Sequence, residues 1–419
     1  MVRPRSTDDR AAPPRRRGSR VPSQIVWRLT LLLSLLVLHA SCTFPGSVKP
    51  TLKIGLVAPF EGRYRYVGYD VIYAVRLALQ EVNEAGGVAG YGVELVAYDD
   101  GGTAEMAVDQ ARKLWVDPDV VGVVGHFRQS TTSAALDTYA RVGLPLVAPT
   151  AMDPDLGSRE AVLTLAPTAD RVARVLIDRA AGLASDGDVL LVTDGGALGE
   201  AVQEAAREQE TWPPGMRLDV VSVVEPGWQQ EVLARYPEVV LCDLNPVPAG
   251  ELATVLGEGA WPGDVLGGPQ LAATDFVAVA GTAAAGARFV TPWPFPHDVP
   301  GGGAFAAAYR SASDGTEAGP LALPAYEGTW LLLQALEEAA RQGDPSRAGV
   351  AASLSGVQRQ GLLGRLPAGR GDGSFDGVLY WYHIGPDGVP IMGDNEGSGG
   401  RMPRARRVLP GAVASSTAS

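Results

Sequence analysis

Two adjacent carboxylates, Asp99 and Asp100, offer the first chemistry in this sequence, because paired carboxylates can bind divalent cations. They end a predicted strand and precede Thr103, where a helical pattern begins. Side chains at such a position cap the following helix, and we favour this interpretation over metal binding. Three histidines remain beyond residue 41: His126, His297 and His383. Their spacing, without a neighbouring cysteine, does not fit a zinc site.

Nucleophilic catalysis is not indicated either. The sequence has no Gly-x-Ser-x-Gly turn and no serine, histidine and acid placed for a triad, so we expect no enzyme. We also expect no cofactor. His126 is interpreted as a structural residue at a strand end, with ligand contact as the alternative. Four aromatic residues are interpreted as core or hinge packing rather than as a stacking platform for a ligand: Trp293, Phe295, Trp381 and Tyr382.

Three arginines could supply an anion site. Arg63 and Arg65 lie in the segment after the first predicted strand, and Arg128 lies beside Gln129 after a later strand. A guanidinium pairs bidentately with a carboxylate, so these side chains could direct the site toward an anion or a carboxylate-bearing compound. The alternative is that the arginines are solvated surface charges. The sequence leaves both interpretations open.

The start of the chain has the layout of a secretory signal. A basic stretch is followed by the apolar run Leu29 to Leu38 and by small residues before Cys42. This run of about ten residues is shorter than the roughly 20 that a helix needs to cross a bilayer. We therefore predict a signal peptide over 1–41 and a linker over 42–51. Lipidation of Cys42 is favoured over plain secretion, although Leu38 stands one position early for a lipobox.

The charge of the chain argues against several classes of partner. The net charge is −12, and because the first 41 residues hold eight Arg and two Asp, residues 42–419 carry −18. An acidic surface repels phosphate backbones and anionic headgroups, so we expect no nucleic acid and membrane contact only through the lipid anchor. Cys242 lies in an apolar run and is interpreted as a buried strand residue, with no partner for a disulfide.

Strand and helix patterns alternate from Thr51 onward, as is typical of parallel sheets flanked by helices. Residues 52–58 form the first predicted strand, and apolar residues from Val71 to Val82 then recur at helical spacing. The first lobe continues with a strand at 92–98, a helix at 103–115, a strand at 120–125, a helix at 130–141 and a strand at 144–148. The second lobe has predicted helices at 169–184 and 196–209 and strands at 188–193, 217–224, 238–242 and 264–268.

The length of the chain indicates two lobes, because 419 residues exceed the roughly 250–300 at which single cores stop growing. The long helical pattern from Leu321 to Ala340 is expected to pack on lobe one. The predicted boundaries are 52–168 plus 294–366 for lobe one, 169–293 plus 367–393 for lobe two, and a disordered tail over 394–419. The predicted fold class is α/β, with a parallel sheet in each lobe.

Five segments occur in a characteristic order: Ile54 to Pro59, Glu81 to Val88, Tyr98 to Asp100, Gly125-His126, and Gly143 to Pro149. Their order and spacing resemble the leucine/isoleucine/valine-binding group of type 1 periplasmic binding proteins, which serve ABC importers. The resemblance implies two Rossmann-like lobes joined by three hinge strands, with the ligand at the carboxyl ends of strands. Helix N-termini near Ser130 and Asp170 are then expected to face the ligand.

The resemblance also implies ligand-binding positions. Four of them depart from the family's pattern, which has a serine, a threonine, a tyrosine and an acidic residue at the positions of Gln129, Met152, Leu198 and Gln270. A fifth departure is Val67, which stands next to Tyr66 at the position of an aromatic residue in the family. The full set of expected ligand-binding residues is Tyr66, Gln129, Ser130, Thr150, Ala151, Met152, Asp170, Leu198, Gln270 and Tyr326. Because Gln270 offers no charge to an ammonium group, we expect weak binding of branched-chain amino acids.

Taken with the family resemblance, these patterns predict an extracytoplasmic solute-binding lipoprotein of an ABC importer. We expect it to be a monomer that captures a small polar ligand, amino-acid-like or a carboxylate or amide, by closing its lobes. Permease subunits of the importer are its expected partners. The alternative is a ligand sensor, or a degenerate binding scaffold that acts through a partner protein.

Overall fold

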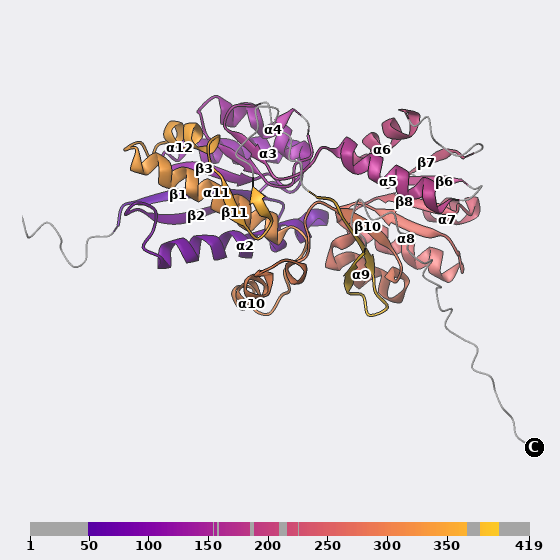
Figure 1. Cartoon of the computed structure of the whole chain (residues 1–419). Coiled ribbons are helices and arrows are strands. Elements are labelled where there is room, and N and C mark those ends of the chain that lie inside the picture. The colour runs from indigo at the N-terminus through magenta and orange to yellow at the C-terminus, as the bar shows by residue number, and fades with distance from the viewer. Residues whose placement is uncertain are drawn as a thin grey trace, which may run out of the picture. The chain divides into compact units, whose positions relative to one another are not determined.

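Figure 1 shows the computed structural model of the chain. It describes residues 49–153, 155–156, 159–184, 188–208, 216–224, 226–366 and 378–393. The predicted signal peptide, Cys42 and the predicted tail lie outside the described residues, as does most of the predicted linker. Within the described part of the chain, no helix combines the length and the apolar character that crossing a membrane requires.

The first sheet has five parallel strands in the order β2-β1-β3-β4-β5. They are β1 (Thr51–Ala58), β2 (Gly92–Asp99), β3 (Val120–Gly125), β4 (Leu146–Ala148) and β5 (Val162–Thr164). Every residue of β3 is buried, as expected of a central strand with helices on both faces of its sheet. Successive side chains of β1 alternate between two cores, Leu56 in one and Val57 in the other.

Among the described residues, six helices accompany this sheet: α2 (Arg65–Glu84), α3 (Ala104–Val116), α4 (Gln129–Ala140), α10 (Gly302–Ala312), α11 (Ala322–Arg341) and α12 (Arg347–Leu354). We call the sheet with these helices lobe one. Helix α11, which covers the long helical pattern near Leu321, contacts α2, α12 and β3. Helix α11 therefore packs on the first sheet, although most strands of the second sheet lie between β5 and α11 in the sequence. A hairpin of β11 (Arg359–Gly361) and β12 (Gly364–Leu366) lies beside α11.

The second sheet has seven strands in the order β14-β13-β10-β9-β8-β6-β7. They are β6 (Val189–Thr193), β7 (Leu218–Ser222), β8 (Val239–Asp243), β9 (Asp264–Gly267), β10 (Arg288–Thr291), β13 (Tyr380–Ile384) and β14 (Pro390–Met392). Strands β6 to β10 are parallel and repeat the order of the first sheet, whereas β13 joins β10 in antiparallel fashion. The prediction of an α/β fold with a parallel sheet in each lobe is confirmed.

Helices on this second sheet complete lobe two: α5 (Ala169–Leu183), α6 (Ala197–Glu208), α7 (Trp228–Arg235), α8 (Pro246–Glu258) and α9 (Thr274–Ala280). Short 3-10 helices are η1 (Gly62–Tyr64), η3 (Pro269–Ala272), η4 (Gly281–Ala284) and η5 (Pro296–Asp298). Cys242 in β8 is buried, as predicted, and burial raises the pKa of its thiol.

The chain passes from lobe one to lobe two after β5 and returns after β10. The two passages lie together, because the indole N–H of Trp293 donates a hydrogen bond to the backbone oxygen of Leu165 at 3.1 Å. A third passage lies between β12 and β13, where residues 367–377 are outside the described part. The aromatic residues predicted to pack in the core or hinge are all buried. Phe295 and Tyr382 pack with Phe289, and Trp293 borders the cavity described next.

Candidate functional site

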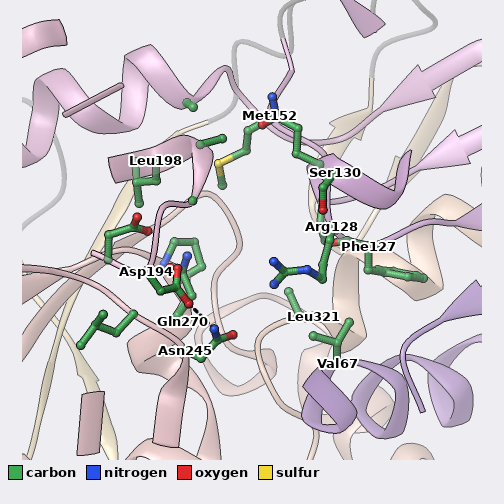
Figure 2. A pocket seen from close by; sticks show the side chains of 18 of the residues that line it. Val67, Phe127, Arg128, Ser130, Met152, Asp194, Leu198, Asn245, Gln270 and Leu321 are labelled. Carbon is green, nitrogen blue, oxygen red and sulfur yellow. Dashed lines mark hydrogen bonds between the residues drawn. The ribbon is translucent and has the colours of Figure 1, made fainter. Parts of the chain in front are cut away.

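A cavity of about 440 Å³ is lined by both lobes (Figure 2). Most of its wall comes from segments that directly follow the carboxyl ends of strands β3 and β4 in lobe one and β6, β8 and β9 in lobe two. Parallel α/β sheets bind ligands at this edge, because strands end and helices begin there. Because both sheets have this strand order, the cavity lies at the carboxyl ends of strands from both lobes.

Seven of the ten expected ligand-binding residues line this cavity: Tyr66, Gln129, Ser130, Thr150, Met152, Leu198 and Gln270. The other three do not. Ala151 is buried, and its carbonyl accepts a hydrogen bond from Thr164. Asp170 borders an adjacent hollow next to α6. Tyr326 lies in the core of lobe one, where its hydroxyl donates a hydrogen bond to Glu81 at 2.5 Å. A role in ligand binding stays a prediction for each of the ten.

The lobe-one wall presents the guanidinium of Arg128, which occupies the N-cap position of α4 without capping the helix through its side chain. The guanidinium carbon lies 3.5 Å from the centroid of the Tyr64 ring, and Figure 2 shows the side chain extending into the cavity. Its Nε is buried and has no hydrogen-bond partner among the described residues. Arg63 and Arg65 are exposed and do not line the cavity. Of the three arginines considered from the sequence, Arg128 is the one placed to meet a ligand.

The N-terminus of α4 adds backbone donors to the same wall. Gln129 and Ser130 are its first helical residues, and no side chain caps them. The hydroxyls of Thr131 and Thr132 instead donate to the Arg128 carbonyl, at 3.1 and 2.8 Å. N–H groups of a first helical turn have no partner within the helix, and the helix dipole makes this end positive. Together with Arg128 they form an environment suited to an anion.

The lobe-two wall is acidic. Asp194 follows β6 and Asp243 ends β8, which is the strand next to β6. The side-chain amide of Asn245 donates to Asp194, and the Thr193 hydroxyl donates to Asp243 at 2.8 Å. Burial raises the pKa of Asp243 to about 6, and the charge of Asp194 acts in the same direction. Asp194 is therefore close enough to influence the ionisation of Asp243.

Gln270 in η3 completes this acidic wall. Its Oε1 is buried and accepts no hydrogen bond from any described residue. The expectation of weak binding for branched-chain amino acids depended on Gln270 being uncharged. Because Asp194 and Asp243 stand on the same wall, that wall is charged even without a carboxylate at residue 270. Weak binding of these amino acids stays a prediction, and the two carboxylates argue against it.

Apolar side chains fill the space between the polar groups: Val67, Phe127, Met152, Leu198, Leu244, Trp293 and Leu321 line the cavity. A ligand with a hydrocarbon part would bury it against them. The sequence patterns do not single out Asp194, Asp243 or Asn245. Each lies at the end of a strand of lobe two or within two residues of it, so the rule that ligands bind at carboxyl ends of parallel strands could have found them.

His126 lies outside the cavity and is completely buried. Its Nδ1 is 2.6 Å from Asp100, and its Nε2 is 3.0 Å from the Tyr139 hydroxyl. These contacts agree with the structural interpretation of this histidine. They also account for Asp100, whose other carboxylate oxygen accepts the Gly102 N–H at 2.9 Å.

The helix-capping interpretation of Asp99 and Asp100 is wrong, because Thr103 is the residue that caps α3. Asp99 instead accepts the N–H groups of Phe60 and Gly101, at 2.8 and 2.9 Å, and so holds a loop. In the described ranges, no group of three or more histidine, cysteine or acidic side chains is arranged to hold a metal ion.

Comparisons with known proteins match this architecture. A family model described as periplasmic binding protein matches residues 51–211 and 236–388. The Leu/Ile/Val-binding protein BraC3 of Rhizobium johnstonii is 30% identical over 272 residues, which cover 63% of this chain and 73% of that protein.

Solved structures show the same fold. The branched-chain amino acid transporter substrate binding protein LivJ of Streptococcus pneumoniae, in complex with isoleucine, has a TM-score of 0.71 at 18% identity, covering 82% of this chain and 100% of that one. A solute binding protein of an ABC transporter from Rhodopseudomonas palustris, in complex with 3,4-dihydroxy benzoic acid, has a TM-score of 0.71 at 20% identity, covering 82% and 97%.

Proposed function

The chain belongs to the periplasmic binding protein family, and on that basis we propose that it is the solute-binding component of an ABC importer that captures a small carboxylate-bearing compound between its lobes. Proteins of this family are solute-binding proteins that act outside the cytoplasm, and they are not enzymes. The specific ligand class, the permease partner and the manner of membrane attachment are the proposed parts.

The observation that carries the proposal is the guanidinium of Arg128 in the cavity wall. Its Nε lacks a partner among the described residues, and it stands next to the uncapped N-terminus of α4. A buried guanidinium N–H without an acceptor costs free energy, about 1–3 kcal/mol or more. A carboxylate placed against Arg128 and the first turn of α4 would remove that cost and gain charge-assisted hydrogen bonds.

The ligands named for the related proteins support this choice. Leucine, isoleucine, valine and 3,4-dihydroxy benzoic acid differ in shape, in aromatic character and in the presence of an amino group. All four carry a carboxylate. A receptor for a carboxylate on the lobe-one wall is compatible with each of them, whereas the rest of the molecule would be selected by the other walls.

A thermal-shift screen of the mature protein tests the ligand class. The panel contains carboxylates, each with its neutral primary amide, together with sugars and urea-like compounds. A ligand at about 100 times its dissociation constant adds roughly 2.7 kcal/mol to the free energy of unfolding. We expect at least one carboxylate to raise the melting temperature and its amide to have little effect. Shifts from sugars or urea-like compounds alone would contradict a carboxylate ligand, and the absence of any shift would support the degenerate-scaffold alternative.

Lobe closure on the ligand is the proposed mechanism of capture. A solute that contacts both walls binds more strongly when they approach each other, so it favours the closed form. The radius of gyration measured by X-ray scattering should therefore decrease when the carboxylate with the largest thermal shift is added at saturation. An unchanged scattering curve would contradict closure.

Membrane attachment through lipidated Cys42 is proposed from the sequence, and this residue lies outside the described part of the chain. With the lipid as its anchor, the mature protein would work as a monomer at the outer face of the membrane and deliver solute to permease subunits. The Cys42→Ser protein should then leave the membrane fraction and appear soluble outside the cell. Unchanged fractionation would indicate a different attachment.

A further inference from the structure

The passage that returns the chain from lobe two to lobe one alternates proline with large rings. From the end of β10 onward, the sequence reads Thr291-Pro-Trp-Pro-Phe-Pro-His-Asp298, and we call this segment the strap. Its first six residues are buried, although connecting segments usually run over the surface. The strap therefore takes part in the packing of the lobes as well as joining them.

Trp293 fixes the strap to lobe one. Its side chain is almost fully buried in the core that also holds Leu165, and its indole N–H donates to the Leu165 carbonyl at 3.1 Å. The Thr291 hydroxyl accepts the Trp293 N–H and donates to the Trp293 carbonyl, both at 3.2 Å. Moving Trp293 away from lobe one would break the indole hydrogen bond and expose a large apolar ring.

Phe295, two residues later, fixes the strap to lobe two. It is buried in the core that holds Phe289 and Tyr382, whose ring centroids lie 6.5 and 5.2 Å from its own. The Tyr382 hydroxyl accepts the Phe295 N–H at 3.1 Å and donates to Asp298 at 2.7 Å. One tyrosine of lobe two therefore holds the strap at two points.

The backbone between the two anchors has little freedom. The ring of Pro294 fixes its own φ at about −65° and restricts Trp293, the residue before it. Pro296 restricts Phe295 in the same way, and Phe295 has the extended torsions φ −70° and ψ 154°. The ψ torsion of Pro294 is then the least restricted torsion between the anchors. A rotation of one lobe against the other finds few torsions in the strap that can absorb it.

We propose that the strap is a stop that limits how far the two lobes open in the solute-free protein. Trp293 and Phe295 are two residues apart but lie in different cores, so lobes that separate beyond the reach of this short segment would draw one ring out of its core. Such exposure of apolar surface is unfavourable, and widely open forms are therefore rarely populated. The stop does not depend on which compound the cavity binds.

Pulsed electron spin resonance measures the range of lobe separations. Spin labels are attached to Asp109→Cys on α3 of lobe one and to Arg174→Cys on α5 of lobe two, both at exposed positions. The labelled protein is solute-free and carries Cys42→Ser, and its remaining native cysteine, Cys242, is buried and protected from the label. The width of the distance distribution reports how many degrees of opening the lobes sample.

Removing the lobe-two anchor should release the stop. In Phe295→Ala, we expect the distance distribution to broaden and the radius of gyration from X-ray scattering to increase, because more open forms become populated. Phe276→Ala is the matched control, since Phe276 is fully buried in the same core but lies on α9, outside the strap. It should keep the normal distribution and the normal radius.

A milder pair of variants decides the question if Phe295→Ala does not fold. Tyr382→Phe keeps the ring and loses only the hydroxyl that holds Phe295 and Asp298, so it should broaden the distribution in the same sense but less. Tyr139→Phe loses a buried hydroxyl contact within lobe one and should change nothing. Unchanged distributions in the strap variants, or equal broadening in their controls, would overturn the stop and would leave the proposed capture of a carboxylate untouched.

Discussion

The guanidinium carbon of Arg128 lies 3.5 Å from the centroid of the Tyr64 ring. Tyr64 is nearly buried at the end of η1, and its hydroxyl accepts a hydrogen bond from Arg63. Its ring lies so close to the backbone of Gly102 that a Cβ there would come within 2.3 Å of it. The ring is thus fixed from behind and offers one face to Arg128. This arrangement orients the guanidinium toward the cavity.

The first prediction concerns the support that the Tyr64 ring gives to Arg128. Replacing the ring in Tyr64→Leu removes the cation–π contact, which is worth about 1 kcal/mol, so carboxylate affinity should fall about fivefold. Tyr64→Phe keeps the ring and loses only the hydrogen bond from Arg63, and its affinity should stay within about twofold. Calorimetry with the carboxylate that gives the largest thermal shift measures both. Equal losses in the two variants would show that the hydroxyl, and not the ring, positions Arg128.

The second prediction concerns Asp70 of α2, which shapes another part of the cavity. Its carboxylate accepts the N–H groups of Gly319 and Leu321, both at 2.7 Å, and Leu321 lines the cavity. Burial raises the pKa of Asp70 to about 6, from a value of 3.8. The native state therefore holds this proton more tightly than the unfolded state does. The resulting stability is present below the unfolded pKa and is lost as pH rises through about 6.

The measurement is the free energy of unfolding of the normal protein and Asp70→Asn at pH 5 and pH 7.5. Between pH 5 and pH 7.5, we expect the normal protein to lose about 1 kcal/mol more of its free energy of unfolding than the variant, because the variant cannot titrate at this position. Asp109→Asn, at an exposed position on α3, should keep the normal pH dependence. If Asp70→Asn and the normal protein lose the same free energy, the buried carboxylate does not titrate in this interval.

The third prediction concerns the hairpin that precedes the third passage between lobes. Glu327 of α11 is completely buried, and it accepts hydrogen bonds from Arg359 and from the Leu362 N–H, both at 2.6 Å. Arg359→Met leaves this carboxylate without its cation, which should cost about 3 kcal/mol. Arg365 lies on the same hairpin but is exposed, so Arg365→Met should change little. Urea unfolding compares them, and equal midpoints would contradict a stabilising role for the buried pair.

Much of the fold could be predicted because it depends on local patterns. Strand β3 is a short run of valine and glycine, and α2 repeats apolar residues at helical spacing, so both are recognisable without tertiary information. The repeated alternation then implied parallel sheets. The expected ligand-binding residues after β3, β4, β6 and β9 were identified through the family resemblance, because it aligns individual positions as well as types of element.

Contacts between distant residues could not be predicted from local patterns. Tyr326 keeps a family-like identity, but its partner Glu81 lies 245 residues away and holds it in the lobe-one core. Asp194 and Asp243 meet only because β6 and β8 are neighbours in the sheet. No local pattern around either aspartate predicts that these two strands are neighbours. The helix-capping interpretation of Asp99 and Asp100 was wrong for a related reason, because their partners Phe60 and His126 lie on other segments.

The most direct test of a carboxylate receptor in the cavity is a calorimetric titration of Arg128→Gln with the best-binding carboxylate of the thermal-shift screen. Arg141→Gln is the control, because Arg141 is exposed at the opposite end of α4. Loss of a charged hydrogen-bonding partner should lower affinity about tenfold to hundredfold in Arg128→Gln, and Arg141→Gln should bind as the normal protein does. Undiminished binding by Arg128→Gln would contradict the account.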